Sequence, residues 1–161
     1  MTTTNESFES RLWRWGANLF PAYRRSGGKV TFVAANFQEV HVSIKNTWRT
    51  KNHLGLTWGG SIYAAVDPIF GVMLHKLLGN QWYVVDSQAT IHFLKGLKTH
   101  ANAQFVITNH ELLKIKQSLA QSNKAEHEFI VNIIANGQVH VKCTKKVAIR
   151  PKRVHSDEPS K

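Results

Sequence analysis

The chain has 161 residues, with 21 Lys and Arg against 10 Asp and Glu, so its formal net charge is +11. This length predicts one domain, and a hydrophobic fraction of 42% excludes an intrinsically disordered chain. The one cysteine, Cys143, excludes an internal disulfide framework and a zinc site built on several thiolates, and it is consistent with a cytoplasmic location. The excess of bases predicts a negatively charged partner: nucleic acid, an anionic membrane or a phosphorylated small molecule.

The sequence offers no clear targeting or membrane segment. Its first ten residues, MTTTNESFES, are polar and no apolar run follows them, so a standard signal peptide is not expected. The most apolar stretch, residues 62–78, is interrupted by Asp67, His75 and Lys76. We therefore expect no transmembrane span.

The N-terminal third predicts one helix and a pair of strands. Residues 8–20 form a short amphipathic helix in this prediction, because apolar side chains recur at helical spacing and Pro21 follows. These side chains are Phe8, Leu12, Trp15 and Leu19. Residues 29–35 and 38–44 then predict a hairpin, since the second of them alternates between apolar and polar residues.

The middle of the chain predicts a long buried helix, because residues 59–78 are apolar on nearly every side and Gly79 closes them. Burial on every side also suggests that a second subunit helps to cover this helix. The rest of the chain predicts a short helix and several strands. The helix spans residues 110–121, and the strands are 82–94, 101–107, 129–135 and 139–143.

Short turns join these strands, and Asn136-Gly137 is a strong hairpin signal, so the sheet must be largely antiparallel. The predicted fold class is therefore α+β, with a curved antiparallel β-sheet wrapped around one long buried helix. We expect an N-terminal helical segment over residues 1–28, the main domain over 29–150 and a flexible basic tail over 151–161.

The most informative stretch joins the polar loop to the buried helix. It reads NHLGLTWGGSIYAAVDP from Asn52 to Pro68, with Asp67 seven residues after Gly60. This spacing resembles the hotdog-fold acyl-CoA thioesterases, and most closely a family of tetrameric acyl-CoA thioesterase-like proteins. The segment LWRWGANLFPAY, the Val-Val-Asp run ending at Asp86 and the inserted helix extend the resemblance over about residues 10–150.

The resemblance implies a hotdog fold, a homodimer that assembles further into a homotetramer, and hydrolysis of acyl-CoA thioesters. Coenzyme A would enter as part of the substrate, and no separate cofactor is expected. Asn52 matches a loop Asn of the family, which would orient the water or the carbonyl group. Trp58 stands where the broader family has His, and this exchange removes a general base or a carbonyl contact.

The chemistry of the motif can also be argued from the residues. Gly59, Gly60 and Ser61 open a helix, so their backbone N–H groups are unpaired and can stabilise a developing oxyanion. Asp67 is the carboxylate of the same helix, but seven steps of about 1.5 Å separate it from Gly60 by roughly 10 Å. We therefore expect Gly60 of one subunit to work with Asp67 of a second subunit.

Further roles follow from this hypothesis. Burial predicts a raised pKa for Asp67, which would act as a base or as a nucleophile. Ser61 would supply a secondary polar contact, and bases such as Lys95 would bind the phosphates of coenzyme A. The acyl chain would lie beside three residues of the helix, which are Tyr63, Val66 and Phe70.

Plainer interpretations stay open. Asp67 could cap a new helix that starts at Pro68, and Gly59-Gly60 could be a simple turn. Asp86 is expected to make a structural hydrogen bond, and the basic run 145–153 to be a solvated face. The nine His show no metal-binding spacing, so no metal site is expected.

Two alternative functions remain. A non-catalytic hotdog module that binds acyl chains or acyl-CoA is favoured by Trp58. A nucleic-acid binder is disfavoured, because the five Trp lie outside the basic run.

Overall fold

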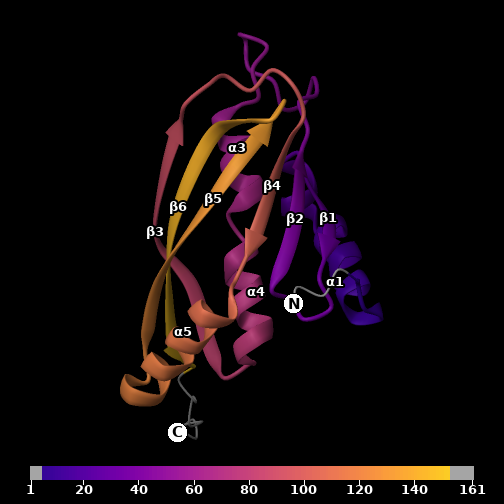
Figure 1. Ribbon diagram of the computed structural model, residues 1–161. Helices are drawn as coiled ribbons and strands as arrows, with labels where there is room; N and C mark the ends of the chain where they lie inside the picture. The colour runs from indigo at the N-terminus through magenta and orange to yellow at the C-terminus, as the bar shows by residue number, and fades with distance from the viewer. Residues whose placement is uncertain (1–4, 153–161) are drawn as a thin grey trace, which may run out of the picture.

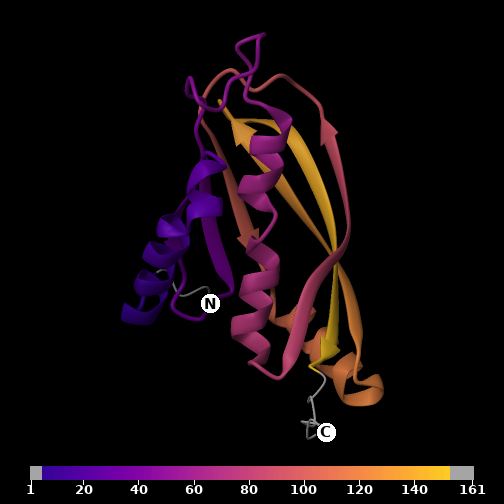
Figure 2. The same ribbon diagram turned by 180° about the vertical axis from the view of Figure 1, so that it is seen from behind.

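The computed structural model describes residues 5–152, which form five helices and six strands (Figures 1 and 2). The helices are α1 (Phe8–Leu19), α2 (Pro21–Arg25), α3 (Gly59–Val66), α4 (Ile69–Leu78) and α5 (Asn109–Ser122). The strands are β1 (Gly28–Val33), β2 (Glu39–Ile44), β3 (Trp82–Phe93), β4 (Ala101–Val106), β5 (Ala125–Ala135) and β6 (Gln138–Pro151).

One curved antiparallel sheet wraps around the central helices, which confirms the predicted hotdog architecture (Figure 2). Its strand order is β1-β2-β4-β5-β6-β3, so β3 lies at an edge. Asn136 and Gly137 both have positive φ, 51° and 72°, as a tight hairpin between β5 and β6 requires. β6 is longer than predicted and reaches Pro151, so most of the expected basic tail lies outside the described residues.

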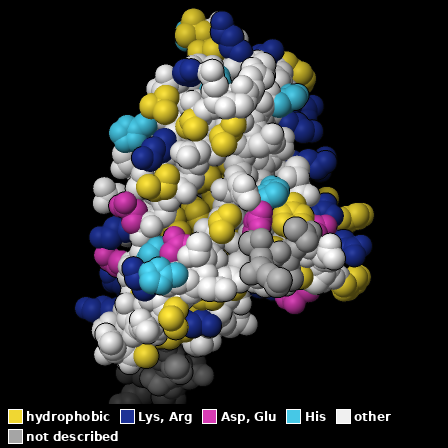
Figure 3. All heavy atoms as spheres, in the orientation of Figure 1, with side chains coloured by type: hydrophobic (Ala, Val, Ile, Leu, Met, Phe, Trp, Pro, Cys, Tyr) yellow, Lys and Arg dark blue, Asp and Glu magenta, His cyan; other side chains and the backbone are white. Residues whose placement is uncertain are grey.

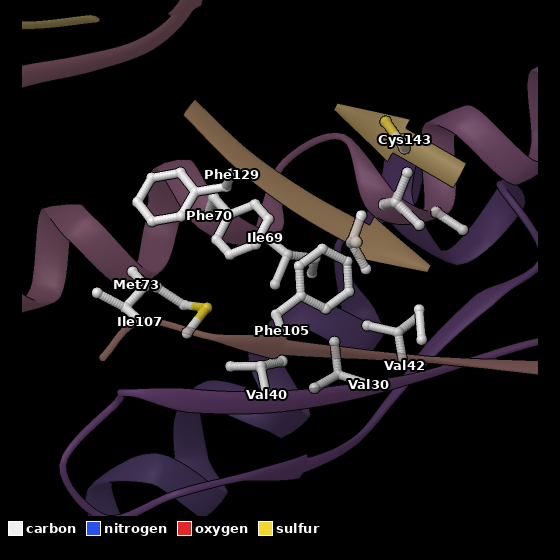
Figure 4. Close-up of a cluster of buried hydrophobic side chains, with 14 of the residues drawn as sticks. Val30, Val40, Val42, Ile69, Phe70, Met73, Phe105, Ile107, Phe129 and Cys143 are labelled. Atoms are coloured by element: carbon white, nitrogen blue, oxygen red, sulfur yellow. The ribbon is translucent and has the colours of Figure 1, made fainter. Parts of the chain in front are cut away.

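The core lies between the inner face of the sheet and the central helices (Figure 4). Phe70 of α4 occupies its middle, with its ring 4.4 Å from that of Phe129 and 5.0 Å from that of Phe105. Val66 and Phe70 are both almost fully buried. These two side chains therefore hold the helices to the sheet.

The predicted long helix is divided at Asp67-Pro68, where α3 ends and α4 begins. Pro68 has no N–H to donate to the preceding turn, so the hydrogen-bond ladder is interrupted there. The expectation that Asp67 caps a new helix is wrong. Asp67 has helical dihedrals, Pro68 is the residue before α4, and no side chain caps that helix.

The helical stretch Gly59–Leu78 has 20 residues and a mean hydropathy of 1.2, so by length and composition it reaches the range of a membrane span. In the structure one face of this stretch packs against the sheet, with Ile69, Met73 and Leu74 turned into the core. The prediction of burial on every side is wrong for the described chain, because Ala64 and Lys76 are exposed. It is the core helix of the fold.

Gly28 marks the closest approach of β1 to α3. A Cβ atom at this position would lie 2.7 Å from Cβ of Ala65 and 3.0 Å from the hydroxyl of Tyr23. We expect Gly28→Ala to lower the free energy of unfolding by about 1–3 kcal/mol, because the strand and the helix must separate. Urea denaturation measures this change.

Gly16→Ala is the matched control, since nothing lies within 4 Å of a Cβ atom there. This variant should raise the stability by up to about 1 kcal/mol, because alanine favours the helix over glycine. Equal effects of the two substitutions would contradict the close packing of β1 on α3.

Candidate active site

A buried lysine joins two carboxylates beside the break in the central helix. Lys145 of β6 has no exposed side-chain surface, and its Nζ atom lies 3.1 Å from Oδ1 of Asp67. The same ammonium group contacts the backbone carbonyl of Asp67 and Oδ2 of Asp86. Asp67 is the outer member, with 45% of its side chain exposed, whereas only 20% of the Asp86 side chain is exposed.

Three separate elements position this cluster. Lys145 lies at an inward position of β6, in the same alternation as the buried Cys143 and Val147. Asp86 lies on β3 at a bulge, because Asp86 pairs with Val147 while Gln88 pairs with Lys146, which leaves one extra residue on β3. Bulges re-aim side chains beside functional sites. Asp67 lies at the end of α3, beside the break in the helix.

The cluster separates the pKa values of its two carboxyl groups. Burial alone would raise the pKa of Asp67, but the charge of Lys145 and a hydrogen bond from Tyr63 outweigh it and hold this pKa below 3.8. Burial also raises the pKa of Asp86, and the charge of Asp67 raises it further. Burial and the adjoining Asp67 raise the pKa of Tyr63 to about 12. Near neutrality Asp67 is therefore ionised and Tyr63 protonated.

The predicted raised pKa of Asp67 is thus wrong in direction, because the prediction considered burial without a neighbouring cation. The expectation of a fully solvated basic run is also wrong at Lys145, which is buried, although Lys146 is exposed as expected. Asp86 forms the structural contact that was expected of it.

Asp67 opens onto a cavity of about 670 Å³ between the central helices and β3. Its polar lining comes from Asp67, Asp86, Tyr63, His75 and Lys152. Much of the remaining lining is the half-exposed face of β3, an edge strand that pairs with no other strand of the described residues on its outer side. A second chain could complete this wall.

Three other predicted site residues lie around a separate cavity of about 370 Å³. Asn52, Gly59 and Lys95 line it together. The Asn52 side-chain oxygen already accepts the backbone N–H groups of Leu54 and Leu56, so it also shapes its own loop. Within one chain, the structure therefore does not bring this group together with Asp67.

Trp58 lies over the start of α3. A Cβ atom on Gly60 would meet its ring at 2.7 Å, and 61% of Trp58 is exposed. Ser61 is buried in the first turn, with 7% of its surface exposed. The aromatic residue that stands where the broader family has His thus packs closely against Gly60, the proposed oxyanion donor.

Two residues expected to contact an acyl chain belong to the core instead. Val66 and Phe70 line neither of the cavities described above, whereas Tyr63 lines the Asp67 cavity. A third cavity, of about 400 Å³, adjoins the Asp67 cavity along Pro68 and Val72. Its lining is almost wholly apolar and comes chiefly from Trp13, Ala17, Phe20, Tyr23 and Ile69.

Lys145 is the member that the sequence prediction missed. The signal was present, because Lys145 is in phase with the apolar residues of β6, which are Val141, Cys143, Val147 and Ile149. Within residues 5–152 no group of three or more His, Cys, Asp or Glu is placed to hold a metal ion.

Replacement of Lys145 tests the cluster directly. Lys145→Met leaves the largely buried Asp86 and the half-exposed Asp67 without their cation, so we expect the free energy of unfolding to fall by about 3 kcal/mol at neutral pH. The folded-state pKa of Asp67 lies below its ordinary value of 3.8. In the wild type, the stabilisation from Asp67 is therefore present above pH 3.8 and is lost as the pH falls through the lowered pKa. In the variant, both carboxyl pKa values are raised, so protonation on acidification should recover part of the loss.

The matched control is Lys146→Met, which breaks an exposed pair with Glu126 and should leave the stability nearly unchanged. Urea denaturation at several pH values measures both variants. An equal and pH-independent effect of the two substitutions would contradict the assigned charge cluster.

Comparisons with known proteins agree with this fold. A protein of unknown function from Pseudomonas aeruginosa, described as a probable thioesterase, has a TM-score of 0.79 at 15% identity, covering 91% of this chain and 99% of its own. A thioesterase from Haemophilus influenzae has a TM-score of 0.69 at 11% identity, covering 97% and 99%. A mutant of the phenylacetic acid degradation protein from Thermus thermophilus has a TM-score of 0.54 at 17% identity, covering 81% and 98%.

At these identities the likeness establishes the hotdog fold. No curated protein matches the chain significantly. A family model described as a domain of unknown function, DUF4442, matches residues 11–149. This match spans most of the chain, from within α1 to near the end of β6. The chain therefore belongs to the DUF4442 family, within the hotdog fold.

Proposed function

We propose that the protein hydrolyses acyl-CoA thioesters to a free acid and coenzyme A. The observation that carries this proposal is the ionised Asp67, which Lys145 holds at the wall of a large cavity. Fold neighbours that are described as thioesterases support the reaction class. A cytoplasmic location fits a coenzyme A substrate and the unpaired, buried Cys143.

In the first form of the proposed reaction, Asp67 withdraws a proton from water, the water oxygen adds to the thioester carbonyl carbon, the C–S bond breaks and the leaving thiolate takes that proton. In the second form, the Asp67 carboxylate attacks the carbon and expels the thiolate, and water then hydrolyses the mixed anhydride to the free acid, which regenerates Asp67 and supplies the proton of the thiol. The developing oxyanion would accept the N–H groups at the start of α3, chiefly that of Gly60. Asp86 and Lys145 act as positioning residues that fix Asp67.

The substrate would occupy cavities that already exist. An acyl chain fits the apolar cavity beside Pro68 and Val72, which opens next to Asp67. The phosphates of coenzyme A would meet bases such as Lys95, which lines the separate cavity near the start of α3. Thus Ile69 and Trp13 replace Val66 and Phe70 as the proposed acyl contacts.

A complete site requires two chains in this proposal. Asp67 lines one cavity of the chain, whereas Gly59, the neighbour of Gly60, lines another. The outer edge of β3 offers 12 residues of strand for pairing with a second copy. Such a homodimer would unite Asp67 of one subunit with Gly60 of its partner, and two dimers would form the proposed tetramer.

A second candidate is a hotdog module that binds acyl chains or acyl-CoA without hydrolysis. The Trp58 ring favours it, because it packs against Gly60 and replaces the His that the broader family has beside the oxyanion donor. Wild-type protein that binds acyl-CoA esters of several chain lengths but hydrolyses none would establish this candidate and overturn the first.

Replacement of Asp67 tests the reaction. Asp67→Asn keeps the side-chain shape but removes the charge, so kcat should fall by about a hundredfold or more. A colorimetric assay for free thiol, run over acyl-CoA esters from short to long chains, measures this loss. Glu126→Gln, at an exposed ion pair, is the control and should retain full activity. Full activity of Asp67→Asn would refute the assigned role.

Mixing two inactive variants tests the shared site. Gly60→Pro removes the proposed N–H donor in the first turn of α3, where proline is tolerated and the exposed Trp58 ring can turn aside. Co-expressed with Asp67→Asn, it should recover about a quarter of the wild-type activity, because half of the dimers carry one intact site of two. Persistent inactivity of the mixture, with each variant folded by thermal melting, would contradict the shared site.

A further inference from the structure

The apolar stripe of α1 faces away from the protein. Four side chains recur at i, i+4, i+7 and i+11 and are largely exposed, with Phe8 at 83% and Trp15 at 64%. With the adjoining Phe20, they form the α1 stripe, which comprises Phe8, Leu12, Trp15, Leu19 and Phe20. A surface helix of a globular protein ordinarily turns such a stripe toward the core. Here the stripe has no cover within residues 5–152.

Polar contacts hold the opposite face of α1 to the body. Asn18 exchanges two hydrogen bonds of 2.8 Å with the backbone of Val30 in β1. Arg14 pairs with Glu6, which also accepts the backbone N–H of Val33. Ser10 is fully buried on this side. The outward direction of the stripe is therefore fixed by specific contacts with the sheet.

Unpaired bases lie on α1 and on the two elements that it contacts, α2 and β1. Four exposed bases of this region form no ion pair with any described residue, and they are Arg11, Arg24, Arg25 and Lys29. The acids nearby are already engaged, Glu6 by Arg14 and Glu9 by Lys76. Figure 3 shows hydrophobic and basic side chains next to one another at the right-hand edge, where α1 lies in Figure 1. The surface is thus apolar and cationic together.

We propose that α1 binds the surface of a membrane that contains anionic lipids. Its length of about 18 Å would lie in the membrane plane, with the α1 stripe among the upper acyl segments. The four bases would meet the lipid phosphates, and Trp15 suits the boundary between headgroups and hydrocarbon. This proposal does not depend on the thioesterase hypothesis.

Charge favours lipid over a second copy of the chain as the cover. A symmetric contact between two α1 stripes would bring both sets of unpaired bases together, without free acids to offset them. An anionic bilayer satisfies the apolar side chains and the bases at the same time.

Vesicle sedimentation with the full chain tests the proposal. We expect binding to vesicles of phosphatidylcholine with roughly 30% phosphatidylserine, and much weaker binding to phosphatidylcholine alone. Raising the salt from about 0.05 M to about 0.5 M should weaken the binding, because it screens the bases. The double variant Leu12→Ser/Trp15→Ser should bind these vesicles at least about tenfold more weakly than the wild type.

The matched control is Leu113→Ser, which removes an exposed leucine of α5 and should bind vesicles as the wild type does. Light scattering and thermal melting show whether each variant keeps its mass and its fold. Failure of the wild type to bind anionic vesicles would overturn the proposal. A lower oligomeric mass of the double variant, with no vesicle binding by the wild type, would overturn it in favour of a contact between copies.

Discussion

The buried ammonium group of Lys145 is the constraint on which the site depends. Removing such a group from water costs several kcal/mol unless carboxylates and hydrogen bonds compensate. Asp67 and Asp86 supply this compensation from two different elements, the end of α3 and the edge strand β3. The break at Pro68 and the bulge beside Asp86 are therefore parts of one arrangement, since each lies beside a carboxylate that contacts the same cation.

This arrangement also fixes what Asp67 can do. A cation in contact with a carboxylate lowers its pKa, which keeps it ionised but makes it a weaker base. In the proposed reaction, Lys145 would orient Asp67 and keep it charged, whereas the rate would come from the placement of Asp67 against the substrate and from preorganised donors. Because the start of α3 lines a different cavity from Asp67, the proposed chemistry requires the proposed dimer.

Much of the fold could be predicted because it rests on local patterns. Strict alternation located β2 and β4, and the Asn136-Gly137 turn located the hairpin of β5 and β6. The register shift at Ile133/Ile134 could not be read from that turn. The cluster was harder, because a charged residue inside a basic run looks solvated unless its phase along the strand is followed. Lys145 and Lys146 are adjacent and chemically identical, yet one is buried and the other exposed, since successive residues of a strand face opposite sides.

The direction in which a side chain faces was also hard to predict for α1. Helical spacing identified an apolar stripe on this helix, but spacing specifies only that a stripe exists and not which neighbour it faces. Asn18 and Arg14 decide the direction, because each has a partner on or beside β1 that only the inner face can reach. The structure therefore shows where part of the excess positive charge lies. Part of it is neutralised inside the cluster at Lys145, and part lies on α1 and on the elements that it contacts, where it converts an exposed apolar surface into one suited to anionic lipid.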